Sequence, residues 1–500
     1  VYCYGFNGTV EPVFINTIIW NSDSSFGFQD TNQANPIISY CNLESGFPTT
    51  GTNGGGNFSI DPLFCNPDSG DYTLAENSSC IAAGANGSNI GAFGVGCGSI
   101  HIGPLWYVAT TGSDATGNGT YTNPFATIQT AIDSSSDGDT VLVEAGTYVE
   151  NINFNGKNIA VIGEDRETTI IDGDSSGSVV TFNSGEDSTT LFSGFSITNG
   201  SGNLNHNNEW LVGGGVYVKE SYPKLNDLHI FGNTAQGASA VYFYDWVYLK
   251  NSIIDNNSGG GKIISVQRVE ASDAEGIIEN VLINENSCYE SVITIWECYG
   301  GTINLTNLTI ANNTSTSGSN FFGGVYFEAA VTMNIQNSII FGNEPTNIGI
   351  SDNSTTPVTA NIFYSDIEGG EDGIVYNGNP IINFDYNIDA NPLFCNPGSG
   401  DFSLGENSPC VGTGENGANM GAFGVECGIV NQVLNVPVDY ATIQGAIDAS
   451  IDGDTVLIHP GIYEGAYLYN KNINLFSLYS TTGDTGYISN TIIDGDDDGC

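Results

Sequence analysis

The chain has 500 residues, of which 56 are Asp or Glu and only 8 are Lys or Arg, so its formal net charge is −48. Binding to nucleic acid or to an anionic membrane needs a basic surface, which eight scattered cations do not supply. No apolar run approaches the ~18 residues that span a bilayer. Hydrophobic residues make up 40% of the chain, too many for a disordered polymer. We therefore expect a folded protein that neither binds nucleic acid nor inserts into a membrane.

Two sequence blocks each occur twice. DPLFCNPDSGDYTL, from Asp61, returns 330 positions later as NPLFCNPGSGDFSL from Asn391. ATIQTAIDSSSDGDTVLVEAGTY, from Ala126, returns as ATIQGAIDASIDGDTVLIHPGIY from Ala441. The second block follows closely after the first both times, so one marks the end of a module and the other marks the start of the next.

This order predicts the rear of one module over residues 1–98, a complete module over 104–428 and the front of a third over 429–500. We interpret the chain as a window on a longer tandem array. The alternative is a 500-residue product with two open ends. We expect residues 1–20 and 485–500 to be continued by further modules or by another copy of the chain, with Cys3 and Cys500 finding partners across that boundary.

Each module opens with a segment of helical periodicity. Ile128, Ala131 and Ile132 recur at the spacing of one helix face. We expect a short amphipathic helix there, which covers the open end of the strands that follow. Almost nothing else in the chain has helical periodicity.

A shorter repeat fills the complete module. Segments of the type NSIIDNN close on an Asn at intervals of 24, 29, 27 and 30 residues, and each follows another β-rich run. Short strands repeated in this way, without hairpin turns, are what a parallel β-helix requires, because each coil buries its inward side chains by stacking on its neighbour. The Asn residues tolerate a left-handed turn and can form a ladder of stacked amides. They are Asn233, Asn257, Asn286, Asn313 and Asn343.

Two segments carry a family resemblance. The stretch WYVATTGSDATGNGTYTNPFATIQTAID, from Trp106, resembles the start of right-handed parallel β-helix proteins of the pectin-lyase-like superfamily. The DPLFC…IGAFGVGC block is similar to the end segment of large secreted bacterial β-helix repeat proteins, which are often surface-attached. The resemblance implies an all-β, right-handed parallel β-helix solenoid in tandem modules, each opened by a short capping helix. It does not imply an activity, since the superfamily contains lyases, hydrolases, esterases and adhesins.

The catalytic motifs of polygalacturonases and pectin methylesterases are not found in this sequence. Polysaccharide lyases of this fold instead need a Lys or Arg base beside a uronate carboxylate. Aligned coils bring cations, carboxylates and aromatic rings together at one place, which is either a carbohydrate site or an ordinary polar sheet face. Its residues are Lys219, Tyr244, Asp245, Trp246, Arg268, Trp296, Glu297 and Glu328.

Eleven cysteines in a Lys-poor chain indicate an oxidising compartment, either secreted or at the cell surface. Their pairing does not follow from the sequence, and each end block holds three, so one of the three stays free or bonds elsewhere. The disulfide candidates are Cys65, Cys80, Cys97, Cys288, Cys298, Cys395, Cys410 and Cys427.

One metal motif is present near the C-terminal end. Asp494, Asp496 and Asp498 form a DxDxDG sequence, typical of the start of a Ca²⁺ loop. The alternative is an acidic turn, and no other cofactor is expected.

These features favour a non-enzymatic extracellular protein, a rigid stalk, fibre or adhesin shaft built from tandem β-helix modules. Its partners are then further copies of itself or adjacent modules, end to end. The alternative function is a carbohydrate-binding or polysaccharide-lyase-like protein that uses the face around Lys219, Arg268 and Trp296, with glycans as partners.

Overall fold

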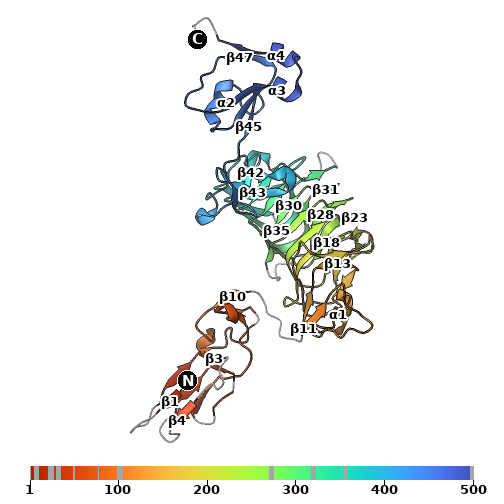
Figure 1. Cartoon of the computed structure of the whole chain (residues 1–500), viewed down its shortest axis with the longest axis vertical. Helices are drawn as coiled ribbons and strands as arrows, with labels where there is room; N and C mark the ends of the chain where they lie inside the picture. Colours follow the sequence, from red (N-terminus) through yellow and green to blue (C-terminus); the bar gives the residue numbers. More distant parts are fainter. Residues whose placement is uncertain are drawn as a thin grey trace.

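The computed structural model describes residues 2–4, 11–20, 27–29, 35–44, 46–48, 51–76, 78–97, 105–269, 275–316, 323–352 and 358–495. Strands dominate these residues (Figure 1). Between β11 (Leu105–Val108) and β41 (Ile381–Asp385) they form one arrangement of 25 strands. Its pairs are parallel and join each coil to the next, so the predicted all-β parallel β-helix solenoid is confirmed.

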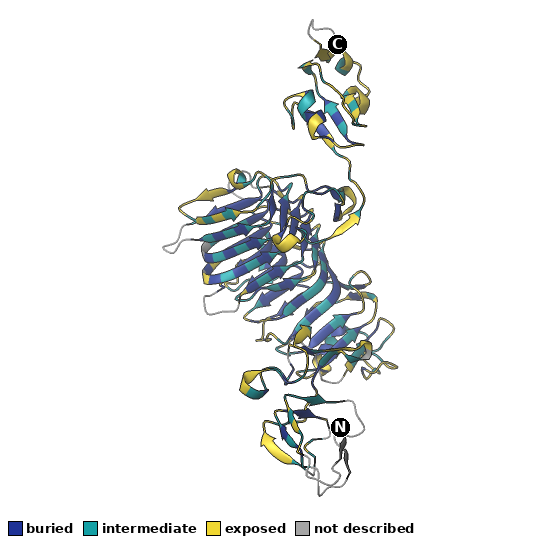
Figure 2. Ribbon diagram, turned by 90° about the vertical axis from the view of Figure 1, so that its left-hand side faces the viewer, coloured by how far each residue is buried: buried dark blue, intermediate teal, exposed yellow. Residues whose placement is uncertain are grey.

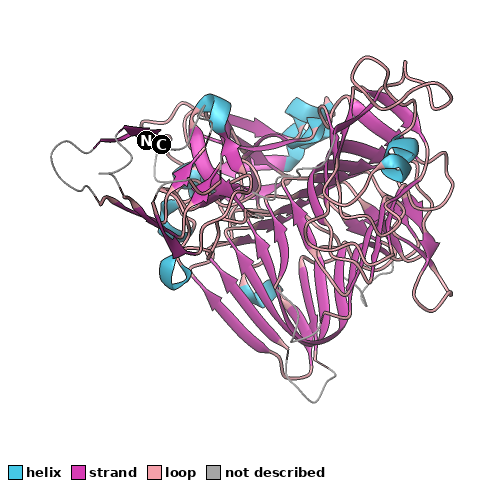
Figure 3. Cartoon of the chain, turned by 90° about the horizontal axis from the view of Figure 1, so that it is seen from below, coloured by secondary structure: helices cyan, strands magenta, loops and turns pink. Residues whose placement is uncertain are grey.

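Three rows of paired strands form the walls of the solenoid, seen from below in Figure 3. The first row consists of β11, β12 (Thr140–Val143), β15 (Ala160–Gly163), β18 (Leu191–Thr198), β22 (Lys224–Phe231), β25 (Tyr248–Lys250), β29 (Gly276–Glu279), β32 (Ile293–Thr306), β35 (Val325–Gln336), β38 (Thr359–Phe363) and β41. The second consists of β13 (Gly146–Val149), β16 (Thr169–Asp172), the ends of β18 and β22, β26 (Ile253–Asp255), β30 (Leu282–Asn284), β33 (Thr309–Ala311), β36 (Ile339–Phe341) and β39 (Asp366–Ile367). The third consists of β14 (Ile152–Asn153), β17 (Val180–Phe182), β21 (Val216–Lys219), β24 (Ala238–Tyr244), β28 (Lys262–Gln267), the starts of β32 and β35, β37 (Ile348–Ser351) and β40 (Val375–Asn377).

Buried residues run along the strands of the solenoid (Figure 2), and the core lies inside the coils, where aliphatic side chains stack in register. Val216, Val241, Ile264, Ile293 and Val325 occupy one inward position on five successive coils, and all are fully buried. The neighbouring residues along each strand point outward, as the period of two requires. Each coil therefore buries its apolar side chains only against the coils before and after it.

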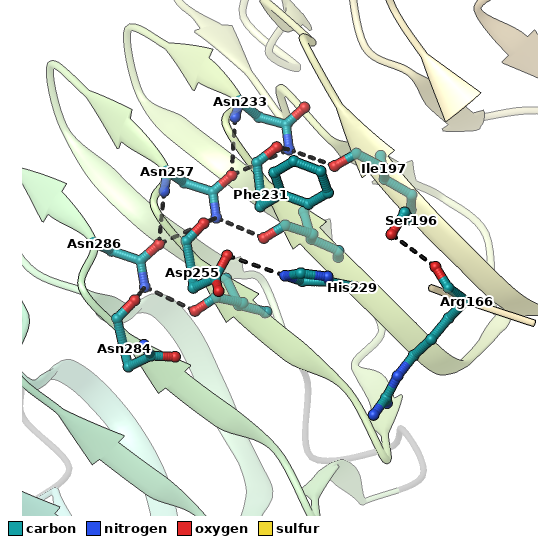
Figure 4. Close-up of polar contacts among 12 residues, drawn as sticks. Arg166, Ser196, Ile197, His229, Phe231, Asn233, Asp255, Asn257, Asn284 and Asn286 are labelled. Atoms are coloured by element: carbon teal, nitrogen blue, oxygen red, sulfur yellow. Dashed lines mark hydrogen bonds and ion pairs between the residues drawn. The ribbon is translucent and has the colours of Figure 1, made fainter. Parts of the chain in front are cut away.

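The predicted asparagine ladder is confirmed (Figure 4). The side-chain amide of Asn233 donates to the side-chain oxygen of Asn257 at 3.1 Å, and Asn257 donates to Asn286 at 3.1 Å. Asn286 donates to Asn313, and Asn313 donates to Asn343, at 2.9 and 2.8 Å. Each side-chain oxygen also accepts from a backbone N–H of the preceding coil. These buried amides therefore provide hydrogen-bond partners for the backbone groups of the turns in which they lie. Four two-residue strands follow the ladder: β23 (Thr234–Ala235), β27 (Ser258–Gly259), β31 (Ser287–Cys288) and β34 (Thr314–Ser315).

The expected capping helix is α1 (Ile128–Ser134), with Ile128, Ala131 and Ile132 buried. The Thr127 side chain accepts from Thr130 N–H at the first turn. At the other end the Lys157 ammonium donates to the carbonyls of Ile132, Asp133 and Ser135, each at 2.7 Å. A cation stabilises the C-terminus of a helix, so Lys157, in the turn after β14, holds the end of α1 in place.

The repeated block that follows the solenoid adds hairpins, which the sequence did not predict. β42 (Phe394–Asn396) pairs antiparallel with β43 (Asp401–Gly405), which pairs with β44 (Val425–Cys427). Phe402 and Met420 pack on Leu282 and Ile339 of β30 and β36, so the block covers the outer side of the second row. A further antiparallel hairpin, β19 (Asn203–Leu204) and β20 (Leu211–Val212), leaves the solenoid between β18 and β21.

The parts of the chain before and after the solenoid contain further copies of these elements. The rear block contains β8 (Phe64–Asn66), β9 (Asp71–Ala75) and β10 (Val95–Cys97), preceded by β1 (Tyr2–Tyr4), β2 (Val13–Ile15), β3 (Ile18–Ile19), β4 (Gly27–Gln29), β5 (Ile37–Ser39), β6 (Asn42–Leu43) and β7 (Thr52–Gly55). The front block contains β45 (Val433–Val436), α2 (Ile443–Ala449), β46 (Thr455–Ile458), β47 (Gly461–Glu464), β48 (Asn474–Ser477), α3 (Tyr479–Thr482), α4 (Gly486–Asn490) and β49 (Thr491–Asp494). None of the helices in the described residues is long and apolar enough to cross a membrane. The boundaries 1–98, 104–428 and 429–500 stay a prediction.

Two disulfides form, Cys65–Cys97 and Cys395–Cys427, one in each copy of the end block. The other four candidates are buried free thiols: Cys80, Cys288, Cys298 and Cys410. Cys80 and Cys410 are the third cysteine of each end block, which was expected to stay free or to bond elsewhere, whereas the pairing considered for Cys288 and Cys298 is wrong. Cys288 ends β31 and Cys298 lies within β32, and both thiols are buried. The Cys410 thiol donates to the Asp366 carboxylate at 3.1 Å. The Cys3 side chain and Cys500 lie outside what the structure describes.

Candidate functional site

Half of the predicted carbohydrate face lies in one outward column on the third row. Lys219 pairs with Tyr244, Tyr244 with Gln267, and Gln267 with Trp296. Glu328 takes the same position on β35, directly after the pair Ile295–Phe327. The sequence alignment missed Gln267 because it ended the strand of that coil one residue early.

The other predicted residues lie one or two positions further, where the chain turns. Asp245, Arg268 and Glu297 have φ angles of 85°, 61° and 52°, so they are corner residues in the left-handed region. The Arg268 guanidinium lies over the Tyr244 ring at 5.5 Å and donates to its hydroxyl at 3.0 Å. Trp246 packs edge-on against Tyr222. These residues form a rim beside the outward column.

A cavity of about 550 Å³ opens over β24, β28, β32 and β35 and is partly covered by the β19–β20 hairpin. We call it the cleft. Of the eight predicted residues, only Trp296 and Glu328 line it, and the remaining six do not. The cleft is also lined by Trp210, Tyr242, Lys262, Ser265, Gln267, Tyr289, Glu290, Thr294 and Tyr326, together with Asn205, His206, Asn207, Glu209, Val212, Gln236, Gly237 and Gly260.

The cleft exists because two small residues interrupt a column of tyrosines. Tyr217, Tyr242, Ser265, Thr294 and Tyr326 occupy one outward position on five successive coils. In the neighbouring coils, a tyrosine ring fills this outward position. Serine and threonine are too small to fill it, so they leave a hollow. The spacing of parallel strands puts the two flanking tyrosines about 14 Å apart along the solenoid.

Aromatic rings form the sides of this hollow. Trp296 donates from its indole nitrogen to the Ser265 hydroxyl at 3.2 Å, which fixes the ring over the floor. Trp210, on the hairpin, is 56% exposed, and Tyr289 is 52% exposed, so both offer ring surface to solvent. An amphipathic ring with one free face suits a ligand that has both C–H and hydroxyl groups.

The polar groups are held in hydrogen bonds or ion pairs. The Lys262 ammonium is 2.5 Å from the Glu290 carboxylate and 5.1 Å from the centre of the Trp296 ring. The Tyr326 hydroxyl donates to Glu328 at 3.2 Å, and burial raises the pKa of Tyr326 above its usual value. Such a tyrosine stays a neutral hydrogen-bonding group at physiological pH.

The hairpin is anchored to the outward face of the third row. The Tyr217 hydroxyl donates to the Leu204 carbonyl at 3.1 Å, and burial raises the pKa of Tyr217 to about 12. The imidazole of His206 hydrogen-bonds the Tyr242 hydroxyl at 3.1 Å and lies over the Tyr244 ring at 4.5 Å. Burial also raises the pKa of Tyr242, so its phenol keeps its proton and donates to Gln267 at 2.6 Å.

No group of three or more His, Cys, Asp or Glu side chains that could hold a metal ion occurs in the described part of the chain. Asp494 closes β49, whereas Asp496 and Asp498 lie outside the described residues. Calcium binding at this motif stays a prediction.

The sequence analysis missed most of the cleft. Lys262, Ser265 and Thr294 lie on the strands that were aligned, and a strict pairing of the outward positions would have found the break in the tyrosine column. Among the described residues, the hairpin with Trp210 has no counterpart in the other coils. Nothing in its local sequence indicates that it folds back over the third row.

No family model matches the chain, and no curated protein matches it. Among solved structures, the pectate lyase Pel9A superposes with a TM-score of 0.40 at 14% identity, covering 66% of this chain and 98% of its own. A rhamnogalacturonan lyase gives 0.37 at 14%, covering 59% and 91%. The pectin methylesterase PemA from Erwinia chrysanthemi gives 0.26 at 12%, covering 55% and 92%. The stacked parallel coils of the chain itself carry the assignment: by its fold, this chain is a parallel β-helix protein.

Proposed function

We propose that this chain is a glycan-binding protein and that the cleft is its binding site. The observation that carries the proposal is the combination, in one cavity of about 550 Å³, of exposed aromatic faces with oriented polar groups. A sugar ring has C–H groups on its faces and hydroxyls around its edge. A pocket with an aromatic wall and a few convergent hydrogen-bonding groups is complementary to such a ring.

Binding without cleavage is the better-supported form of this function. A lyase needs a basic group that can remove the proton beside a uronate carboxylate. The one Lys or Arg among the described residues that line the cleft is Lys262, and its nitrogen is held in an ion pair with Glu290 at 2.5 Å. Lys219 and Arg268, the bases expected from the sequence, do not line the cleft. A flat ultraviolet absorbance trace over a panel of uronate polymers is the expected result.

The test of the proposal is binding of a glycan panel to the parent chain and to Trp210→Ala. Trp210 is exposed and its loss leaves the solenoid core intact, so weaker binding reports on the cleft rather than on folding. Tyr376→Ala, an exposed aromatic of β40 outside the cleft, is the matched control. We expect at least tenfold weaker binding for Trp210→Ala, comparable to the loss of a binding hot spot, and no change for the control. Equal affinities of both variants and the parent would contradict the assignment of the cleft.

A structural role is a second candidate, supported by the way the repeated blocks fold. The end blocks match in detail: Gly91 N–H donates to the Asn16 carbonyl, as Gly421 N–H does to that of Asn337. Such modules suit a rigid extracellular stalk, fibre or adhesin shaft, with adjacent modules or further copies as partners. The two disulfides fit secretion or a cell-surface location. Electron microscopy tests this role: rods or filaments support it, and compact separate particles contradict it.

A further inference from the structure

Thr294, on the floor of the cleft, carries a polar atom without a partner among the described residues. Its hydroxyl oxygen is buried, and none of these residues forms a hydrogen bond with it. The residue is only 3% exposed and lines the cleft. A buried hydroxyl without a partner costs free energy, because it has lost the hydrogen bond to water that it makes in the unfolded chain. A ligand that supplies a hydrogen bond here replaces that lost bond.

Charge limits what that ligand is. The cleft is lined by three carboxylates, Glu209, Glu290 and Glu328, and by the single ammonium of Lys262. Glu290 already pairs with Lys262 at 2.5 Å, so among the described lining residues no Lys or Arg is left to meet a ligand carboxylate. The surrounding chain, at −48, adds to the repulsion of an anion.

Shape limits it further. Along the solenoid the hollow ends at the rings of Tyr242 and Tyr326, which lie in the same outward column as its floor. A long polymer that ran parallel to the axis would have to cross both rings. The space between them suits one short segment whose hydroxyl reaches the floor.

We infer that the cleft binds the uncharged end of a glycan, with a sugar hydroxyl hydrogen-bonded to Thr294 between the Tyr242 and Tyr326 rings. This inference rests on the proposed function, since it assumes that the cleft holds a glycan. It adds the class of ligand, which is neutral rather than uronate, and the residue that contacts its hydroxyl.

Thr294→Val is the sharpest variant, because valine keeps the shape and removes only the unpartnered oxygen. The free protein should melt at the same or a higher temperature, since the substitution removes an unsatisfied buried group. Binding of a neutral oligosaccharide should become about three- to tenfold weaker, the usual effect of one hydrogen bond. Thr332→Val, at an outward position of the first row, is the matched control and should leave binding unchanged. Unchanged binding of the Thr294 variant would overturn the role of this hydroxyl.

The ligand class is tested by calorimetry with hexasaccharides of glucose, xylose or mannose, of galacturonate, and of glucosamine. We expect binding of at least one neutral hexasaccharide, with an affinity that changes less than twofold between low and high salt, because screening acts only on charges. Thr294→Tyr, which refills the hollow as in neighbouring coils, should abolish it. Tighter binding of galacturonate or of glucosamine oligomers would overturn the neutral class while the glycan-binding function stands. Absence of binding by every sugar would instead remove the proposed function itself.

Discussion

The front block of the module occurs twice and allows a direct comparison of the same local structure in two surroundings. Its helices, α1 and α2, bury the same three positions, and Lys157 and Lys471 donate to equivalent helix carbonyls at 2.6 to 2.7 Å. Burial differs. Phe154 is fully buried, whereas Leu468, at the equivalent position 314 residues later, is 55% exposed.

The difference lies in the coils that follow. The Phe154 ring packs against Phe182 at 4.3 Å, from the next coil, and against Phe192 at 6.2 Å. Among the described strands, none pairs with the free edges of β48 and β49. The comparison teaches that local elements of this fold form from their own sequence, while the apolar core exists only where another coil stacks.

The largest expected effect separates these two equivalent positions. Phe154→Ala should lower the free energy of unfolding by about 3 to 5 kcal/mol, because a buried ring leaves a cavity. Leu468→Ala should change it by less than about 0.5 kcal/mol, as expected for an exposed side chain. Urea unfolding followed by tryptophan fluorescence measures this, since Trp106, Trp210, Trp246 and Trp296 lie in or on the solenoid. Similar losses in both variants would contradict the nearest-neighbour interpretation.

A second prediction compares the two rear blocks through one buried position. Asp366 accepts hydrogen bonds from Ala390 N–H and from the Cys410 thiol, and burial raises its pKa to about 6. Asn42 takes the same place in the other copy. Its side-chain oxygen accepts from Ile60 N–H, and its side-chain amide donates to the buried Cys80 sulfur. The fold therefore accepts an amide at this position.

The raised pKa means that the fold favours protonated Asp366. Its contribution to stability is complete below pH 4 and is lost as the pH rises through about 6. Asp366→Asn should match the parent near pH 4 and be more stable above pH 7, by up to about 3 kcal/mol. Urea unfolding of both proteins at several pH values measures the difference, and a difference that does not vary with pH would contradict this account. Asn42→Asp should show the reverse trend in its own block.

The smallest expected effect concerns the helix caps. Lys157→Met and Lys471→Met each remove an ammonium from three helix carbonyls, and each should reduce local stability by about 1 to 2 kcal/mol. Hydrogen exchange of the amides in α1 and α2 measures both losses. Equal changes would sharpen the comparison, because they would show that the cap acts without the following coils. A much larger change at α1 would show that stacking contributes to the cap.

The fold and the site differ in how far they could be predicted from the sequence. The strands follow from the period of two, α1 follows from the spacing of Ile128, Ala131 and Ile132, and the ladder follows from Asn residues that tolerate a left-handed turn. These signals are local. The cleft instead depends on which residues of successive coils lie side by side. Because the coils differ in length, from 24 to 30 residues, the sequence does not fix this register to better than one position.

The sequence by itself therefore determined the tandem blocks, the parallel β-helix, the capping helix and the ladder, because each arises from residues close together in the chain. Only the tertiary structure decided that Gln267 rather than Arg268 follows Tyr244 in the outward column. It also decided that Ser265 and Thr294 leave a hollow between tyrosines, and that the β19–β20 hairpin folds over it. The register shift between Ala238 and Val241 in β24 is one reason, since a single extra residue changes which side chains face outward together.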